Sequence, residues 1–177
     1  HDKEDMDIHI PENVLNPELL EYGTKQAEMT EFYITDDKGV KTTAVIKGTE
    51  FTIHVKVAFH DRIVAPIFAF SFKNIKGTEI TGTNSMIEKA FLEPVEAGVV
   101  KEVTFKQNMS LQGGEYLLSL GVTGYEGSEF QVYHRLYDVL NVTVVSDKDT
   151  VGFYDMNSKV EVKNAAKDKV IPYRQEA

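Results

Sequence analysis

The sequence contains no cysteine among its 177 residues. The chain can therefore form neither a disulfide framework nor a metal site with thiolate ligands. It also has no apolar run near the roughly 20 residues that a membrane-spanning helix needs. A chain of this length can bury a sizeable core as one domain without covalent or metal cross-links.

Several enzyme motifs are missing as well. There is no G-x-x-x-x-G-K-[ST] loop for nucleotide phosphates, no G-x-G-x-x-G, no H-E-x-x-H and no G-x-S-x-G. The spacing of His54, His60 and His134 does not force three ligands to converge on a metal. We therefore expect no catalytic residues, no metal site and no cofactor, although a sandwich can bring together distant carboxylates of the kind that glycoside hydrolysis uses.

Acidic residues outnumber basic ones by 28 to 19, which gives a formal net charge of −9. An acidic surface repels the phosphates of nucleic acids and of anionic lipids, so we expect no nucleic-acid partner. A neutral ligand that offers hydroxyl groups, such as a sugar, is not disfavoured by this charge.

Alternating apolar and polar residues dominate the chain after a polar start. Residues 1–21 are acidic and lack a sustained period, which indicates a linker with one short helical turn at Asn16 and Pro17. In residues 51–59 every second side chain, from Phe51 to Phe59, is apolar, as in a strand with one buried face. Similar patterns predict strands within residues 27–34, 66–74, 76–84, 99–108, 113–125, 129–147 and 151–162.

These segments predict eight or nine strands separated by turns that are rich in Gly, Asn and Asp. Such spacing with little helix is typical of an all-β, antiparallel β-sandwich. Residues 129–147 are long for one strand, so we expect a bend or bulge between Leu136 and Asp138. The domain should span residues 22–163 and be followed by a polar C-terminal tail at residues 164–177.

Several short motifs occur in an order that a known family shares. The opening "YGTKQAEMTEFYITDDKG" resembles the start of the C-terminal domain of Wzt-type ATPases, with Lys25 where that family often has Gly. The matching positions are Tyr22, Gly23, Thr24, Ala27, Asp37 and Gly39. "FAFSFKNIKGTEITGTNS" and "LQGGEYLLSLGV" resemble a later hairpin and strand of the same family. Each motif is weak alone, but their number and order, from Tyr22 to Val162, make the resemblance fairly specific.

Wzt-type ATPases are the nucleotide-binding subunits of ABC transporters that export O-antigen polysaccharides. The resemblance implies an immunoglobulin-like sandwich that binds the lipid-linked glycan, often at its modified non-reducing end. It also implies a homodimer in which the C-terminal strand is exchanged. The domain would act at the cytoplasmic face of the bacterial inner membrane. It would meet the membrane permease subunit through an ATPase domain that this chain lacks, and the chain itself would be no enzyme.

A carbohydrate site needs aromatic rings for the C–H faces of the sugar and polar groups for its hydroxyls. On a regular strand Tyr133, Arg135 and Tyr137 share one face, and we predict that this face binds carbohydrate. Arg135 or a lysine would suit a charged cap such as a phosphate or an acidic sugar. Neighbouring strands could add the polar side chains His54, Lys56, Ser71, Lys73 and Asn84.

Each candidate also has a structural interpretation. Tyr133 and Tyr137 could cover the edge of a sandwich, Arg135 could pair with a surface carboxylate, and Asn84 could stabilise a turn. On a regular strand the opposite face, with Leu136 and His134, would belong to the core. A bulge would reverse the two faces and change the candidate set.

Two further functions remain open at this point. The domain could be a dimerisation module that binds no sugar and pairs its long C-terminal edge strand between subunits. A cysteine-free acidic sandwich is also compatible with an extracellular adhesin-like or fibronectin-like domain.

Overall fold

The computed structural model describes residues 20–91, 93–166 and 173 of the chain. Among these residues there is no helix, and hence none that is long and apolar enough to cross a membrane. The strands are β1 (Leu20–Tyr22), β2 (Ala27–Thr35), β3 (Ala44–Ile46), β4 (Glu50–Phe59), β5 (Ile67–Asn74), β6 (Glu79–Asn84), β7 (Val100–Asn108), β8 (Gly114–Glu126) and β9 (Glu129–Val145).

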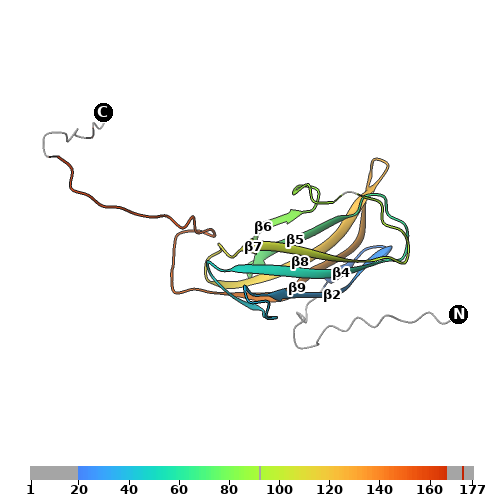
Figure 1. Cartoon of the computed structure of the whole chain (residues 1–177), viewed down its shortest axis with the longest axis horizontal. Coiled ribbons are helices and arrows are strands. Elements are labelled where there is room, and N and C mark those ends of the chain that lie inside the picture. Colours follow the sequence, from blue (N-terminus) through green and yellow to red (C-terminus); the bar gives the residue numbers. More distant parts are fainter. Residues whose placement is uncertain (1–19, 92, 167–172, 174–177) are drawn as a thin grey trace.

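The strands form two sheets that are packed face to face (Figure 1). The six-stranded sheet has the order β1-β9-β8-β5-β6, with β3 also beside β9, and the three-stranded sheet has the order β2-β4-β7. All pairings are antiparallel except that of β3 with β9. The prediction of an all-β antiparallel sandwich with eight or nine strands is therefore confirmed, with one parallel pair that the sequence did not indicate.

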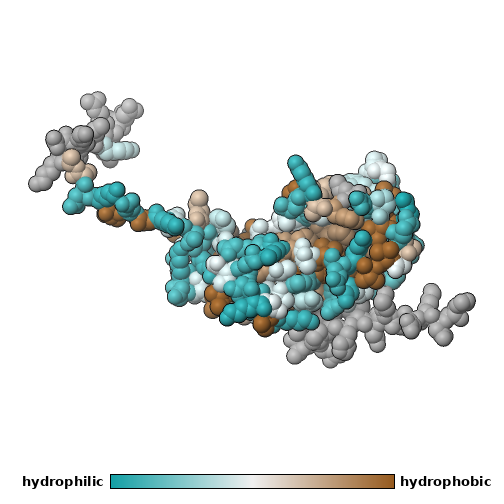
Figure 2. Space-filling view, in the orientation of Figure 1, coloured by the Kyte–Doolittle hydropathy of each residue, from teal (hydrophilic) through white to brown (hydrophobic). Residues whose placement is uncertain are grey.

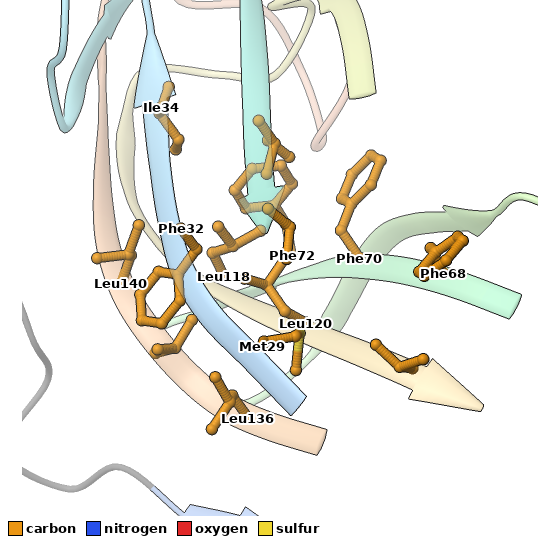
Figure 3. Close-up of a cluster of buried hydrophobic side chains, with 14 of the residues drawn as sticks. Met29, Phe32, Ile34, Phe68, Phe70, Phe72, Leu118, Leu120, Leu136 and Leu140 are labelled. Carbon is orange, nitrogen blue, oxygen red and sulfur yellow. The ribbon is translucent and has the colours of Figure 1, made fainter. Parts of the chain in front are cut away.

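The apolar faces of both sheets meet in one core (Figure 3). Side chains from β2, such as Met29 and Phe32, point toward those of β5, β8 and β9. The alternation predicted for residues 51–59 is confirmed, because every second residue of β4 from Phe51 to Phe59 is buried. Each large apolar side chain removed from water contributes about 1.5–3 kcal/mol before conformational entropy is subtracted. The burial of these alternate apolar side chains therefore stabilises the packing of the two sheets.

The bend expected between Leu136 and Asp138 is confirmed in β9. The register of β9 against β8 shifts at this point, and Asp138 adopts a left-handed φ of 54°. The Asp138 N–H donates to Ser119 Oγ at 2.9 Å, so the amide that leaves the regular ladder keeps a partner.

A second irregularity in β9 lies at Tyr133, outside the segment in which we expected one. Val122 pairs with His134 and Thr123 pairs with Val132, so Tyr133 is the extra residue of a β-bulge. As a result Tyr133 and His134, which are adjacent in sequence, are both buried.

The opening motif packs directly on the backbone of this bulge. A Cβ atom at Gly23 would lie 2.4 Å from the Tyr133 carbonyl oxygen, and Gly23 has a φ of +130°. The Lys25 N–H donates to the same carbonyl at 2.6 Å, and Lys25 itself has a φ of 62°. Glycine adopts such left-handed conformations without strain. The backbone therefore explains why the family that the motif resembles often has Gly at the position of Lys25.

The C-terminal segment corrects one expectation. Residues 151–162, which we predicted as a final strand, form no strand within the described chain, and Tyr154 makes only an isolated bridge with Leu111. After Asp155 the chain runs away from the sandwich (Figure 1), with apolar side chains among hydrophilic ones (Figure 2). Val160 and Val162 are 85% and 91% exposed. A strand-like pattern forms no strand where no neighbour supplies hydrogen bonds.

Asp155 fixes the point at which this segment leaves the sandwich. Its carboxylate lies 3.1 Å from Lys47 Nζ and 2.9 Å from Lys148 Nζ, and its N–H donates to the Ser110 carbonyl at 2.8 Å. Hydrogen bonds from Lys148, from the Asn157 N–H and from Lys47 hold the pKa of Asp155 well below its usual range. The carboxylate is therefore charged at neutral pH and anchors the segment.

The first strand begins slightly before the predicted start of the domain at residue 22. β1 begins at Leu20, inside the expected linker of residues 1–21. The helical turn predicted at Asn16 and Pro17 lies outside the described residues, as does most of the predicted tail at residues 164–177.

We predict that Gly23→Ala lowers the free energy of unfolding by about 2–4 kcal/mol, because it adds a backbone clash to an unfavourable φ. Gly98→Ala is the matched control, since Gly98 has a φ of +87° but open space around it. Its cost should be about 1–2 kcal/mol from the backbone conformation alone. Urea unfolding followed by circular dichroism measures both variants, and equal losses would show that the contact with Tyr133 contributes nothing.

Candidate functional site

The predicted site residues lie in three different places. Five share the outer face of the six-stranded sheet: Ser71, Lys73, Asn84, Arg135 and Tyr137. His54 and Lys56 lie on the outer face of the three-stranded sheet, on the opposite side of the sandwich. Tyr133 lies between the sheets.

Tyr133 is therefore corrected from a ligand candidate to a core residue. It is 1% exposed, and burial raises the pKa of its hydroxyl. Its ring packs on Gly124, where an added Cβ atom would lie 3.0 Å from a ring carbon. The bulge turns this side chain inward, whereas Arg135 and Tyr137 beyond it are half-buried and keep the outward orientation that we predicted.

Small residues form the floor of the outer face of the six-stranded sheet. The register places Arg135 beside Gly121, Gly121 beside Ala69, and Ala69 beside Asn84. Directly paired residues point to the same face of a sheet, so these side chains form one row. A parallel row consists of three further small residues: Ser119, Ser71 and Gly82. Because these residues are small, the middle of the outer face is shallow, and larger side chains at the edges of the face can reach over it.

Tyr137 is the aromatic centre of this surface and is flanked by two cations. Lys73 Nζ lies 5.5 Å and Arg135 Cζ 5.8 Å from the centroid of its ring, and Arg135 Nη1 donates to Tyr137 Oη at 3.2 Å. Asp138 lies 3.9 Å from Lys73, so one carboxylate is also within reach. The surface thus offers an aromatic ring, cationic donors and an acceptor side by side.

β1 adds a second aromatic side chain to this surface. Tyr22 pairs with Arg135 and Leu20 pairs with Tyr137, and both β1 side chains are more than 60% exposed. We call the surface that they complete the Tyr137 face, and it comprises Leu20, Tyr22, Ser71, Lys73, Asn84, Arg135, Tyr137 and Asp138.

Asn84 has the turn-stabilising role that the sequence left open. Its Oδ1 accepts the Ile87 N–H at 2.8 Å and so holds the turn that follows β6. The NH2 group of the same side chain is a hydrogen-bond donor that can meet a ligand on the Tyr137 face.

His54 and Lys56 do not belong to the same site as Arg135. The His54 ring stacks on Tyr33 at 4.5 Å between centroids, and its Nε2 lies 2.8 Å from Thr35 Oγ1. Burial lowers the pKa of His54. Lys56 pairs with Glu31 at 3.2 Å. Both residues serve the surface of the three-stranded sheet, and sequence alternation alone could not tell which sheet each strand joins.

His134 is buried, as expected for its side of β9, and it links the two sheets. The Met29 N–H of β2 donates to its Nδ1 at 2.8 Å, and its Nε2 lies 2.7 Å from Glu21 Oε1 on β1. The hydrogen bond from His134 lowers the pKa of Glu21, with a further contribution from Lys25. Within the described residues, no three His, Asp or Glu side chains are grouped as a metal site requires.

A cleft of about 1320 Å³ opens between the sheets on the side of β6 and β7. The three-stranded sheet is too narrow to cover the six-stranded one, so apolar side chains face this opening. Its aromatic lining consists of Phe51, Phe68, Phe70, Phe72, Phe91, Phe105, Phe153 and Tyr154. The last two belong to the C-terminal segment, which therefore leaves the sandwich at the margin of the cleft.

Sequence reasoning missed three members of the Tyr137 face. Leu20 and Tyr22 lie on a strand of only three residues, which is too short to show a period. Asp138 is half-buried and reaches Lys73 only because the chain adopts a left-handed φ at Asp138 itself. The signal that could have found Tyr22 is the opening motif itself, because Tyr22 is followed directly by Gly23, a glycine in close contact with another strand.

We predict that Tyr133→Ala destabilises the fold by about 3–5 kcal/mol, because it leaves a large cavity beside Gly124. Tyr137→Ala, on the same strand but on the outer face, should change the free energy of unfolding by less than about 1 kcal/mol. Thermal and urea unfolding of the two variants test this difference. A mild effect of Tyr133→Ala would contradict the position of Tyr133 in the core.

Comparisons with known proteins agree with this architecture. The family model described as the Wzt C-terminal domain matches residues 19–156. The crystal structure of the C-terminal domain of wzt has a TM-score of 0.80 at 23% identity, over 92% of this chain and 98% of that chain. The CARDB domain of PF1109 from Pyrococcus furiosus has a TM-score of 0.38 at 17% identity, over 68% of this chain and 94% of that one.

A β-glucosidase from Listeria innocua in complex with gluconolactone has a TM-score of 0.36 at 12% identity, over 66% of this chain and 16% of that chain. A search of curated proteins gave no match. The family match covers more than half of the chain and begins one residue before β1. The chain belongs to the Wzt C-terminal domain family.

Proposed function

We propose that this domain binds the polysaccharide carried by a Wzt-type ABC exporter, and that it does so through the Tyr137 face. The observation that carries the proposal is that Lys73 and Arg135 lie 5.5 Å and 5.8 Å from the ring of Tyr137, on a sheet face that also carries a row of small residues. Membership of the Wzt C-terminal domain family supports it.

The chemistry of this face suits a sugar. The ring of Tyr137 offers an apolar surface for C–H groups, and Tyr22 offers a second one on the neighbouring strand. Arg135 and Lys73 provide donors that strengthen when the ligand carries a negative charge, as a phosphate or an acidic sugar does. Asp138 supplies an acceptor for hydroxyl groups.

The dimensions of the face also favour a chain of sugars over a single ring. Four spacings between neighbouring strands separate Tyr22 on β1 from Asn84 on β6. At about 4.8 Å per spacing, the face is about 19 Å across. Several linked sugar residues can lie across it while their ends remain in solvent.

In this proposal the ligand is the lipid-linked glycan, held near its non-reducing end, at the cytoplasmic face of the bacterial inner membrane. The domain acts as part of the ATPase subunit of the exporter and meets the membrane permease through the ATPase domain. The domain selects the cargo, and it neither carries out a reaction nor uses a cofactor.

We predict that Arg135→Ala and Tyr137→Ala each weaken binding of the O-polysaccharide released from lipopolysaccharide of the source organism by more than about tenfold, or 1.4 kcal/mol. Calorimetric titration of the isolated domain measures this affinity. Lys56→Ala, on the opposite sheet, is the control and should bind as the unaltered chain does. Unchanged affinity in both Tyr137 face variants would remove this face from consideration.

A second candidate function is supported by the C-terminal segment. Beyond Asp155 this segment is exposed, carries valines at alternate positions and leaves the sandwich beside the aromatic cleft. β7 is an edge of the three-stranded sheet and can accept a further strand. The domain would then hold two subunits together by exchange of this segment, with or without sugar binding.

We predict that truncation after Asn157 converts a dimer into a monomer, because it removes the exposed segment but keeps the Asp155 anchor. Light scattering coupled to size-exclusion chromatography measures the mass, and circular dichroism confirms that the sandwich remains folded. Val160→Ser with Val162→Ser is the milder test of the same apolar contact. A truncated chain that remains a folded dimer would exclude exchange of this segment.

A further inference from the structure

β1 is a short edge strand whose alternate side chains face opposite sides of the six-stranded sheet. Glu21 pairs with Leu136, a core residue, and so points toward the interior. Leu20 and Tyr22, on either side of it, point to the Tyr137 face. The strand therefore carries one interior anchor and two exterior side chains within three residues.

The Glu21 side chain bonds to His134, a buried histidine whose two hydrogen bonds define its tautomer. A backbone N–H can only donate, so the Met29 N–H at 2.8 Å requires an unprotonated Nδ1 on His134. A neutral His134 then carries its proton on Nε2 and donates it to Glu21 Oε1 at 2.7 Å. The His134 side chain is 1% exposed, so this is a charge-assisted bond at the edge of the core.

Besides the backbone pairing of β1 with β9, the opening motif makes further contacts just after β1. The Thr24 and Lys25 N–H groups donate to the carbonyls of Val132 and Tyr133. Lys25 also pairs with Glu21 at 3.1 Å, but the two side chains are 48% and 39% exposed, where an ion pair stabilises little. The bond from His134 is thus the side-chain contact that joins β1 to the buried part of the domain.

We infer that Glu21 and His134 are positioning residues for the polysaccharide site: their hydrogen bond holds β1 against β9 and so keeps Tyr22 beside Arg135. This inference rests on the proposed function of the Tyr137 face. A ligand that contacts Tyr22 and β9 together favours the docked strand, and the docked strand favours the ligand by the same factor.

The test combines a structural and a binding measurement on the same variants. Glu21→Ala removes the acceptor, whereas Glu21→Gln keeps an amide oxygen that can accept the His134 proton. Glu50→Ala is the matched control, because Glu50 pairs with Lys106 on the opposite sheet and both are exposed. Hydrogen–deuterium exchange of the peptide containing residues 20–22 reports whether β1 is docked, and thermal unfolding reports the stability of the whole domain.

Affinity for the released O-polysaccharide is measured for Glu21→Ala, Tyr22→Ala and the double variant. We expect Glu21→Ala to lose protection of β1 and to bind about threefold to tenfold more weakly, the range of one aromatic contact. Tyr22→Ala should lose a similar factor, and the double variant should lose no more than either one. Glu21→Gln and Glu50→Ala should match the unaltered chain in both measurements.

Three results would overturn the inference. Protection of β1 that survives in Glu21→Ala shows that the hydrogen bond does not hold the strand. Full affinity in Glu21→Ala after loss of protection, with Tyr137→Ala impaired, shows that the face works without β1. Additive losses in the double variant show that Glu21 does not act through Tyr22. Failure of the unaltered chain to bind is a different result, since it removes the proposed function and this inference with it.

Discussion

The extra residue that β9 carries at Tyr133 determines the orientation of the side chains around it. Because the bulge places Tyr133 and His134 on the same side, the phenol fills the core and the imidazole reaches both β1 and β2. The Tyr133 carbonyl is thereby offered to the Lys25 N–H and approached closely by Gly23. The bulge connects the opening motif, the core and the outer face through a single position of the backbone.

Sequence reasoning predicted the parts of the fold that depend on alternation. The buried faces of β4 and β5 and the bend before Asp138 follow from side-chain period and strand length. Alternation could not predict Tyr133, since one inserted residue inverts the pattern locally without changing composition. Nor could it predict that residues 151–162 lack a strand, because a strand also depends on an available neighbour.

The candidate site was predicted only in part for a related reason. Arg135 and Tyr137 share an outer face as their spacing indicates, and Lys73 joins them from β5. His54 has a similar polar position on its strand, but its strand belongs to the other sheet. Periodicity tells which side chains leave the core, whereas strand order decides which of them meet. The two proposed functions use different surfaces, the outer face of one sheet and the cleft between both, so one chain can serve both.

The position of β9 in the sheet has a consequence for synthesis. Among the described strands, β1 and β3 pair only with β9, and Glu21 meets His134 across 113 residues of sequence. At the usual rate of translation, roughly 6–23 s pass between the synthesis of the two residues. β1 and β3 leave the ribosome long before their partner, and long-range pairing of this kind slows folding. The six-stranded sheet can close only after β9 has been made, so β1 and β3 spend that interval as unpaired strands, which is the state in which strands can pair with other chains.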